Sequence, residues 1–207
     1  FNNKNLLSLE ERSMRIIRRN DISMIFQEPM RSLNPVMSIA DQLEESYKNE
    51  NKKDIKNKIV KNLISVGIND AERVMNLFPH QLSGGMKQRI MIAMAIACKP
   101  KLLIADEPTT SLDVTIQKQV LDLLLKLKDD LNMSILFITH DLAVASQISD
   151  RIVVMKSGEI VEDNYSMDFF KNPKSSYSKA LLESSSYNKR NSPKENKENQ
   201  KVLEVNN

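Results

Sequence analysis

The chain has 207 residues, of which 41% are hydrophobic and 28% charged, with a formal net charge of +3. This length fits one ordinary domain that buries roughly 70% of its unfolded surface. Residues 184–207 hold five basic and three acidic side chains, so most of the excess positive charge lies there. The rest of the chain is nearly neutral, which argues against a nucleic-acid-binding surface.

The apolar runs of the sequence are short. The longest, residues 90–98, has nine residues, whereas a membrane span needs about 20. No signal peptide is expected, and the start at Phe1 instead of Met suggests that an N-terminal portion is missing. Cys98 is the single cysteine, which excludes an intrachain disulfide and a cysteine-based metal site and indicates a reducing compartment.

The first half of the chain combines a strand pattern with helical patterns. Residues 1–21 are polar with a weak helical pattern, and residues 22–26 read as a short buried strand. Residues 28–80 are rich in Asn, Lys and Glu. Within them an apolar stripe from Ile55 to Val66 predicts an amphipathic helix that stops at Gly67.

The second half predicts parallel strands. Residues 102–105 and 135–138 are continuous apolar runs, as expected of strands covered on both faces, and residues 116–131 between them have helical spacing. This order predicts a βαβ unit. Residues 156–159 predict the turn of a hairpin, with Gly158 free to adopt positive φ. From residue 184 onward the composition predicts disorder.

Two adjacent glycines precede the most apolar helix. Ser83, Gly84 and Gly85 lie in residues 82–89 (LSGGMKQR), which run directly into the apolar residues 90–98. Glycines at a helix start let backbone N–H groups approach an anion, and the helix N-terminus adds partial positive charge. The plainer interpretation is a Ser N-cap followed by a glycine turn, with the helix central to the core in either case.

Two carboxylates end the strand at residues 102–105. Asp106 lies where parallel sheets place their ligand crevice and could hold Mg²⁺, which prefers oxygen ligands. Glu107 would face a different direction and could orient a water molecule as a general base. The alternative is a solvated strand end whose acidic groups cap the next turn.

Three further polar residues stand at element ends. His140 follows the strand at 135–138, although a lone histidine is more often structural than catalytic. Gln27 follows the strand at 22–26, where its amide could ligate Mg²⁺ or hold a water molecule, or simply lie in a loop. Asp113 precedes the helix at 116–131 and is, on local grounds, an N-cap.

Taken together and in order, these segments resemble the nucleotide-binding subunits of ABC transporters. Residues 82–89 resemble the signature motif, 102–107 the Walker B strand and 111–113 the D-loop, while Gln27 and His140 match the Q-loop and the switch histidine. Residues 26–35 (FQEPMRSLNP), 106–114 (DEPTTSLDV) and 177–182 are similar to the oligopeptide, dipeptide and nickel importer group. The cysteine-rich tail that carries an iron–sulfur cluster in many of its members has no counterpart here.

The resemblance implies an α/β fold, a P-loop NTPase RecA-like core with an inserted helical subdomain. Residues 1–27 would end the N-terminal part of the cassette, whose first strands are missing. Residues 28–97 would form the helical subdomain with the signature helix, and residues 98–183 the RecA-like core with its closing hairpin. Residues 184–207 would be a disordered tail.

The resemblance also implies roles for the site residues in an ATPase with ATP and Mg²⁺. Ser83 and Gly85 would contact the γ-phosphate of ATP held by a second cassette, identical or paralogous, and Gly84 would belong to the same ATP-binding segment. Asp106 and Gln27 would hold Mg²⁺. Glu107 would polarise the attacking water, and His140 would contact the γ-phosphate. Asp113 would link the two ATP sites.

In that family, hydrolysis drives import through transmembrane permease subunits. The chain would lie peripherally on the cytoplasmic face of a bacterial membrane, and an extracellular or periplasmic solute-binding protein would deliver oligopeptides, dipeptides or nickel. Nucleic acid is not an expected partner. A nucleic-acid-acting ABC ATPase would carry a long insertion, but 54 residues without heptads or cysteines separate Gln27 from Leu82.

One motif of the family is absent from these residues. The phosphate-binding sequence GxxxxGK[ST] does not occur, and the four glycines, at 67, 84, 85 and 158, could not form it. We therefore expect the 207 residues alone neither to bind ATP tightly nor to hydrolyse it, with truncation as the favoured explanation. The alternative is a non-hydrolysing cassette fragment that lends its signature motif to a competent partner.

Overall fold

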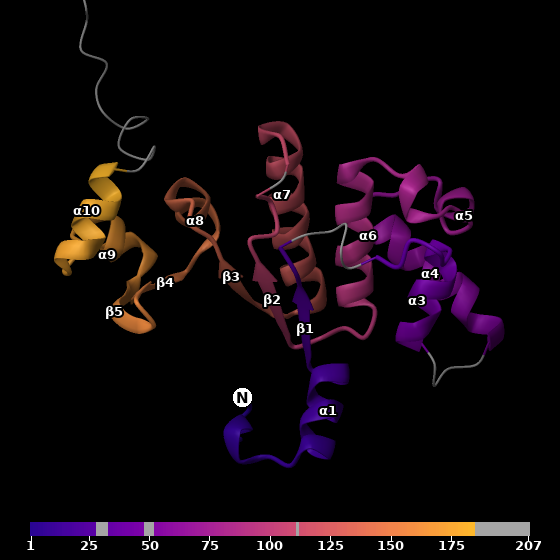
Figure 1. Ribbon diagram of the computed structural model, residues 1–207, viewed down its shortest axis with the longest axis horizontal. Helices are drawn as coiled ribbons and strands as arrows, with labels where there is room; N and C mark the ends of the chain where they lie inside the picture. Colours follow the sequence, from indigo (N-terminus) through magenta and orange to yellow (C-terminus); the bar gives the residue numbers. More distant parts are fainter. Residues whose placement is uncertain (28–32, 48–51, 111, 185–207) are drawn as a thin grey trace, which may run out of the picture. The chain divides into compact units, whose positions relative to one another are not determined.

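The computed structural model describes residues 1–27, 33–47, 52–110 and 112–184. The chain divides into two compact units, Phe1–His140 and Asp141–Asn207, and each is described by itself. The first unit begins with η1 (Leu6–Ser8) and α1 (Glu11–Asn20), as the weak helical pattern predicted, and contains a parallel sheet and a set of helices (Figure 1). None of the helices in the described ranges is both long and apolar enough to cross a membrane.

The sheet of the first unit has three parallel strands in the order β1 (Ile22–Ile25), β2 (Leu102–Asp106) and β3 (Ser134–Ile138). Ile25 pairs with Ala105, and Asp106 pairs with Ile138. The helix α7 (Val114–Leu131) connects β2 to β3, so the predicted βαβ unit is confirmed. The carboxyl ends of all three strands therefore meet at one edge of the sheet.

Between β1 and β2 the described residues form helices and no strand; the division into a helical subdomain stays a prediction. They are α3 (Ile39–Glu44), η2 (Glu45–Tyr47), α4 (Lys52–Ser65), α5 (Ala71–Val74), η3 (Pro79–Gln81) and α6 (Gly84–Ile96). The predicted amphipathic helix corresponds to α4. It ends just before Gly67, which has φ +82°, a conformation that glycine adopts without strain.

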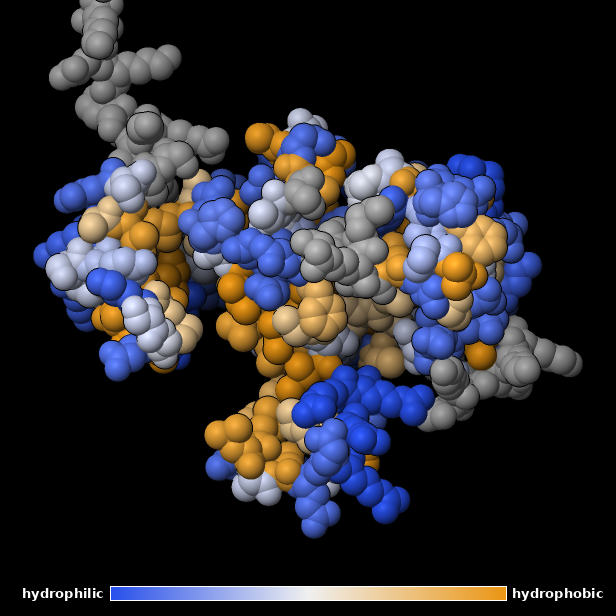
Figure 2. Space-filling view, viewed as in Figure 1, coloured by the Kyte–Doolittle hydropathy of each residue, from blue (hydrophilic) through white to orange (hydrophobic). Residues whose placement is uncertain are grey.

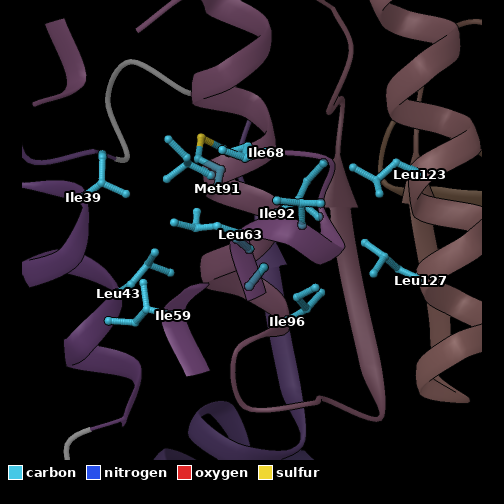
Figure 3. Close-up of a cluster of buried hydrophobic side chains, with 14 of the residues drawn as sticks. Ile39, Leu43, Ile59, Leu63, Ile68, Met91, Ile92, Ile96, Leu123 and Leu127 are labelled. Atoms are coloured by element: carbon cyan, nitrogen blue, oxygen red, sulfur yellow. The ribbon is translucent and has the colours of Figure 1, made fainter. Parts of the chain in front are cut away.

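The helix α6 is buried on nearly all sides and lies at the centre of the core, as its apolar sequence predicted. Figure 3 shows Ile92 and Ile96 of α6 between Leu63 of α4 and the α7 side chains Leu123 and Leu127. The core therefore runs without a break from the helical region to the sheet region. The boundaries at 27/28 and 97/98 stay predictions.

One face of the sheet is covered and the other is open in the part of the chain that the structure describes. Leu103 and Ala105 are fully buried, whereas Met24, Leu136 and Ile138 are 38%, 52% and 44% exposed. Apolar side chains accordingly reach the surface over the strands in Figure 2. The expectation of coverage on both faces is thus not met, because α6 and α7 pack on one face of the sheet.

The described part of the second unit, residues 141–184, contains an antiparallel hairpin and three helices. Its elements are α8 (Leu142–Ile148), β4 (Arg151–Lys156), β5 (Glu159–Tyr165), α9 (Ser166–Lys171) and α10 (Ser176–Ser184). The predicted hairpin turn is confirmed, with Ser157 and Gly158 at φ 51° and 85°, as a two-residue turn of this hand requires. Ser184, which the sequence analysis placed in the tail, ends α10, and residues 185–207 lie outside the described residues.

Candidate functional site

Glu107 occupies a strained turn directly after β2. Its backbone has φ +44°, a left-handed conformation that is uncommon for any residue except glycine. The turn is held by the Glu107 N–H, which donates to the Ile138 carbonyl over 3.0 Å, and by the Thr110 N–H, which donates to the Glu107 carbonyl over 3.3 Å. This conformation takes the Glu107 side chain out of the alternation of the strand.

The carboxylate of Glu107 accepts three hydrogen bonds from side chains. Gln27 Nε2 and Thr110 Oγ1 donate to Oε2 over 2.8 and 2.9 Å, and His140 Nδ1 lies 2.9 Å from Oε1. Gln27 follows β1 and His140 follows β3. The parallel sheet therefore brings the polar groups at its three strand ends together around one carboxylate. We call Gln27, Glu107, Thr110 and His140 the Glu107 cluster.

These contacts lower the pKa of the Glu107 carboxyl below its ordinary value. The hydrogen bond with His140 is the largest cause and that with Thr110 the next; desolvation opposes them, and the Gln27 amide adds a smaller stabilisation of the charge. Glu107 is therefore ionised at neutral pH and can only accept hydrogen bonds. Nδ1 of His140 must carry the proton of their contact, which leaves Nε2 of a 72% exposed side chain to meet a ligand.

Both carboxylate oxygens are thus engaged, but a carboxylate offers about four lone-pair sites, so the three present donors leave Glu107 able to accept a hydrogen bond from a water molecule as well. Gln27 uses its Nε2 here, and its carbonyl oxygen is the atom that suits a cation. Asp106 ends β2 beside the cluster, although the hydrogen bonds recorded within the cluster do not include it.

These oxygens fit Mg²⁺ that arrives with a phosphate ligand. Within the described residues no group of three or more His, Cys, Asp or Glu side chains could hold a metal ion by itself. Mg²⁺ is commonly bound through one or two carboxylates, with substrate phosphates and water completing the octahedron. The Asp106 carboxylate and the Gln27 amide oxygen are the groups at these strand ends that would contribute to such a partial shell.

The start of α6 is a second feature of the unit. Ser83 Oγ accepts a hydrogen bond from the Met86 N–H over 3.3 Å, so the N-cap interpretation is confirmed. A Cβ atom placed on Gly84 would meet nothing within 4 Å, whereas one on Gly85 would lie 3.3 Å from Ile116 Cγ2. The packing of the described residues therefore leaves room for a side chain at position 84 and little at position 85.

Asp113 caps α7. Its Oδ1 accepts from the Thr115 and Ile116 N–H groups over 3.1 and 3.0 Å, which confirms the local interpretation. Ser111 of the predicted D-loop, and residues 28–32 of the 26–35 motif, lie outside the described residues.

The sequence analysis missed Thr110. Its hydroxyl reaches back three residues to the Glu107 carboxylate. A Thr or Ser three positions after a strand-end acid is a local pattern that could have indicated this contact.

Comparison with known proteins decides the family. The ABC transporter family model matches residues 2–110, which is more than half of the chain. The chain belongs to the ABC transporter family. It is 51% identical over 187 residues to the dipeptide transport ATP-binding protein DppD of Haemophilus influenzae, covering 89% of this chain and 57% of that protein. It is 52% identical over 184 residues to the oligopeptide transport ATP-binding protein AppD of Bacillus subtilis, covering 87% and 56%.

Two solved structures confirm the predicted fold class of this ABC chain. The ATP-binding cassette MJ0796, a dimer in a post-hydrolysis state with ADP and Pi, is similar with a TM-score of 0.68 at 28% identity, over 80% of this chain and 72% of that one. CbiO1 from Clostridium perfringens, part of the transporter complex cbiONQ, gives 0.73 at 26% identity, over 83% and 67%. The chain spans just over half the length of the curated relatives it matches.

Proposed function

We propose that this ABC chain belongs to the ATP-binding, ATP-hydrolysing subunit of an importer for oligopeptides or dipeptides. The observation that supports it most is the Glu107 carboxylate, held ionised by donors from three strand ends at the ligand-binding edge of a parallel sheet. The names of the relatives support the cargo class.

In this proposal the attacking water donates to the Glu107 carboxylate, which then accepts its proton. Asp106 and the Gln27 carbonyl oxygen hold Mg²⁺, which neutralises developing charge on the phosphates when it is bound. His140 stays oriented by Glu107 through Nδ1–H and, in its doubly protonated form, donates from Nε2–H to the γ-phosphate.

The start of α6 acts on ATP held by a second cassette. Ser83, Gly84 and Gly85 present backbone N–H groups at a helix N-terminus, which suit a phosphate, and the open space at Gly84 admits it. Asp113 lies at the start of α7, where it would link the two sites. The further partners proposed are permease subunits and, indirectly, a solute-binding protein, with this subunit peripheral on the cytoplasmic face of the membrane.

The phosphate-binding loop of this proposal lies outside these 207 residues, because they contain no GxxxxGK[ST] segment. A test therefore has to supply it. We would replace the matching segment of Haemophilus influenzae DppD with this chain and measure ATP hydrolysis and dipeptide uptake by the assembled transporter. DppD itself is the positive control.

We expect this graft to hydrolyse ATP and import dipeptide. The matched control is the graft with Gly84→Ala, whose new methyl group has room within the chain; it should fold normally but lose turnover, because the methyl group occupies the proposed phosphate position. A graft that assembles but does not hydrolyse ATP would contradict the proposal. Full turnover with Gly84→Ala would remove the assigned role of the α6 start.

A further inference from the structure

The side chain of Gln88 joins the start of α6 to the turn that carries Glu107. Gln88 lies three and four residues after Gly85 and Gly84, on the same face of the helix, and is completely buried. Its Nε2 donates to the Pro108 carbonyl over 2.7 Å. Pro108 directly follows Glu107, so this one hydrogen bond links the two features of the proposed site.

The other end of the same amide has no partner among the described residues. Gln88 Oε1 is buried there and makes no hydrogen bond with any of them. An unpaired buried acceptor opposes folding, and an apolar side chain of similar shape would avoid that cost. The benefit of an amide side chain at position 88 therefore lies in the hydrogen bond that Nε2 donates to Pro108.

The Glu107 N–H bond to the Ile138 carbonyl holds the start of the turn, and Gln88 holds its next residue. Glu107 is in a left-handed conformation, and the hydrogen bond from Thr110 N–H back to the Glu107 carbonyl is long, at 3.3 Å. Proline has no N–H, so the only backbone hydrogen-bonding group of Pro108 itself is its carbonyl. A shift of about 1 Å in this backbone would break carboxylate hydrogen bonds of 2.8–2.9 Å.

We propose that Gln88 is a positioning residue that fixes the Glu107 turn relative to Ser83–Gly85. The inference rests on the proposed function, in which Ser83–Gly85 meet ATP of the partner site while Glu107 acts in its own site. A displacement of the α6 start is then passed through Gln88 and Pro108 to Glu107. Gln88 thereby couples the two ATP sites of the dimer.

The first test is amide hydrogen exchange on the 207-residue chain with Gln88→Met, which keeps the volume and removes the donor. The Glu107 and Thr110 amides should exchange about tenfold faster, because the turn opens locally when it loses this anchor. If the Met variant does not fold, Gln88→Asn, one methylene too short to reach Pro108, should give the same local change.

The matched control is Gln42→Met. Gln42 is another buried glutamine of the first unit, 3% exposed, and its amide accepts from Asn34 N–H over 2.8 Å and donates to the Asn34 and Met37 carbonyls. Gln42→Met should accelerate amide exchange at Asn34 and leave exchange at Glu107 unchanged. Gln88→Met should accelerate exchange at Glu107 and leave exchange at Asn34 unchanged. Unchanged Glu107 and Thr110 exchange in folded Gln88 variants, or equal acceleration by Gln42→Met, would overturn the inference.

A second readout uses the DppD graft. Gln88→Met should lower kcat for ATP by up to about 100-fold and leave KM nearly unchanged, because Glu107 is misplaced while ATP contacts persist. Local exchange that responds to Gln88 in a chain whose graft never hydrolyses ATP would keep the positioning role and remove the proposed function. A graft that hydrolyses ATP, but in which Gln88→Met changes neither amide exchange nor kcat, would keep the proposed function and remove the positioning role.

Discussion

Two carboxylates, one in each unit, are held ionised by different kinds of donor. Glu107 accepts hydrogen bonds from three side chains at strand ends. Glu162 of β5 is 6% exposed and accepts from the backbone N–H groups of Lys174 and Ser175, both over 2.9 Å, at the residues leading into α10, and also from the Ser178 side chain. Side-chain donors can turn toward a ligand without unfolding the chain, whereas backbone donors cannot. Under the proposed function, the backbone donors therefore distinguish the structural carboxylate of Glu162 from that of Glu107, whose donors within the described residues are side chains alone.

The pKa values of both groups point in the same direction for different reasons. Burial is the largest influence on Glu162 and raises its pKa, but the Ser178 hydrogen bond and the two backbone N–H groups outweigh it and lower the pKa overall. Glu107 reaches the same direction chiefly through His140 and Thr110. A lowered pKa alone therefore does not identify a catalytic group, and the nature of the donors has to be considered.

The largest expected effect is on ATP turnover. In the DppD graft, Glu107→Gln should lower turnover by about 10²–10⁴-fold, because the amide keeps the shape of the side chain but cannot take a proton. Glu162→Gln should leave turnover per folded molecule within a few-fold of the parent. The measurement is steady-state phosphate release, normalised to folded protein by circular dichroism. Near-parental turnover of the Glu107 variant would show that Glu107 is no more catalytic than Glu162. It would favour a subunit that only lends its signature motif to a partner.

The reverse order is expected for stability. Glu162→Gln should lower the free energy of unfolding by about 1–3 kcal/mol, because one of two backbone N–H groups would face an amide NH₂ in a buried place. Glu107→Gln should have a smaller effect, since Gln27, Thr110 and His140 are exposed and can be solvated by water. Urea unfolding of the 207-residue chain measures both. A larger loss for Glu107→Gln would make that carboxylate the structural one.

The smallest expected effect is on the pH dependence of stability. Because the folded pKa of Glu162 lies below its ordinary value of 4.5, its stabilisation is present above pH 4.5 and is lost as the pH falls through the folded pKa. The free energy of unfolding should therefore decline more gently with acid in Glu162→Gln than in the parent. Parallel declines in urea titrations between neutral pH and pH 3 would show that Glu162 is not held ionised.

The sequence predicted the strands and their ends because those features carry local signals. Continuous apolar runs locate β2 and β3, and the βαβ order makes them parallel, so Gln27, Glu107 and His140 had to converge at one edge. The N-caps Ser83 and Asp113 were predictable for the same local reason.

The atomic partnerships were not predictable, because they depend on tertiary contacts. Gln27 and His140 both bind the Glu107 carboxylate only because the Glu107 turn adopts φ +44° against the Ile138 carbonyl. The contact between Gln88 and Pro108 joins residues 20 apart through the packing of α6. Coverage of the sheet was also misjudged, since an apolar run does not reveal which segment covers each face.

The most direct measurement is a carboxyl-carbon NMR titration of Glu107 in the 207-residue chain, with and without His140→Ala, using Glu162 as an internal reference. Glu107 should titrate below 4.5 in the parent and move up toward that value in the variant, because its largest stabilising contact is gone, while Glu162 stays unchanged. A Glu107 carboxyl that titrates at or above 4.5 in the parent, or that ignores the loss of His140, would contradict the existence of the Glu107 cluster.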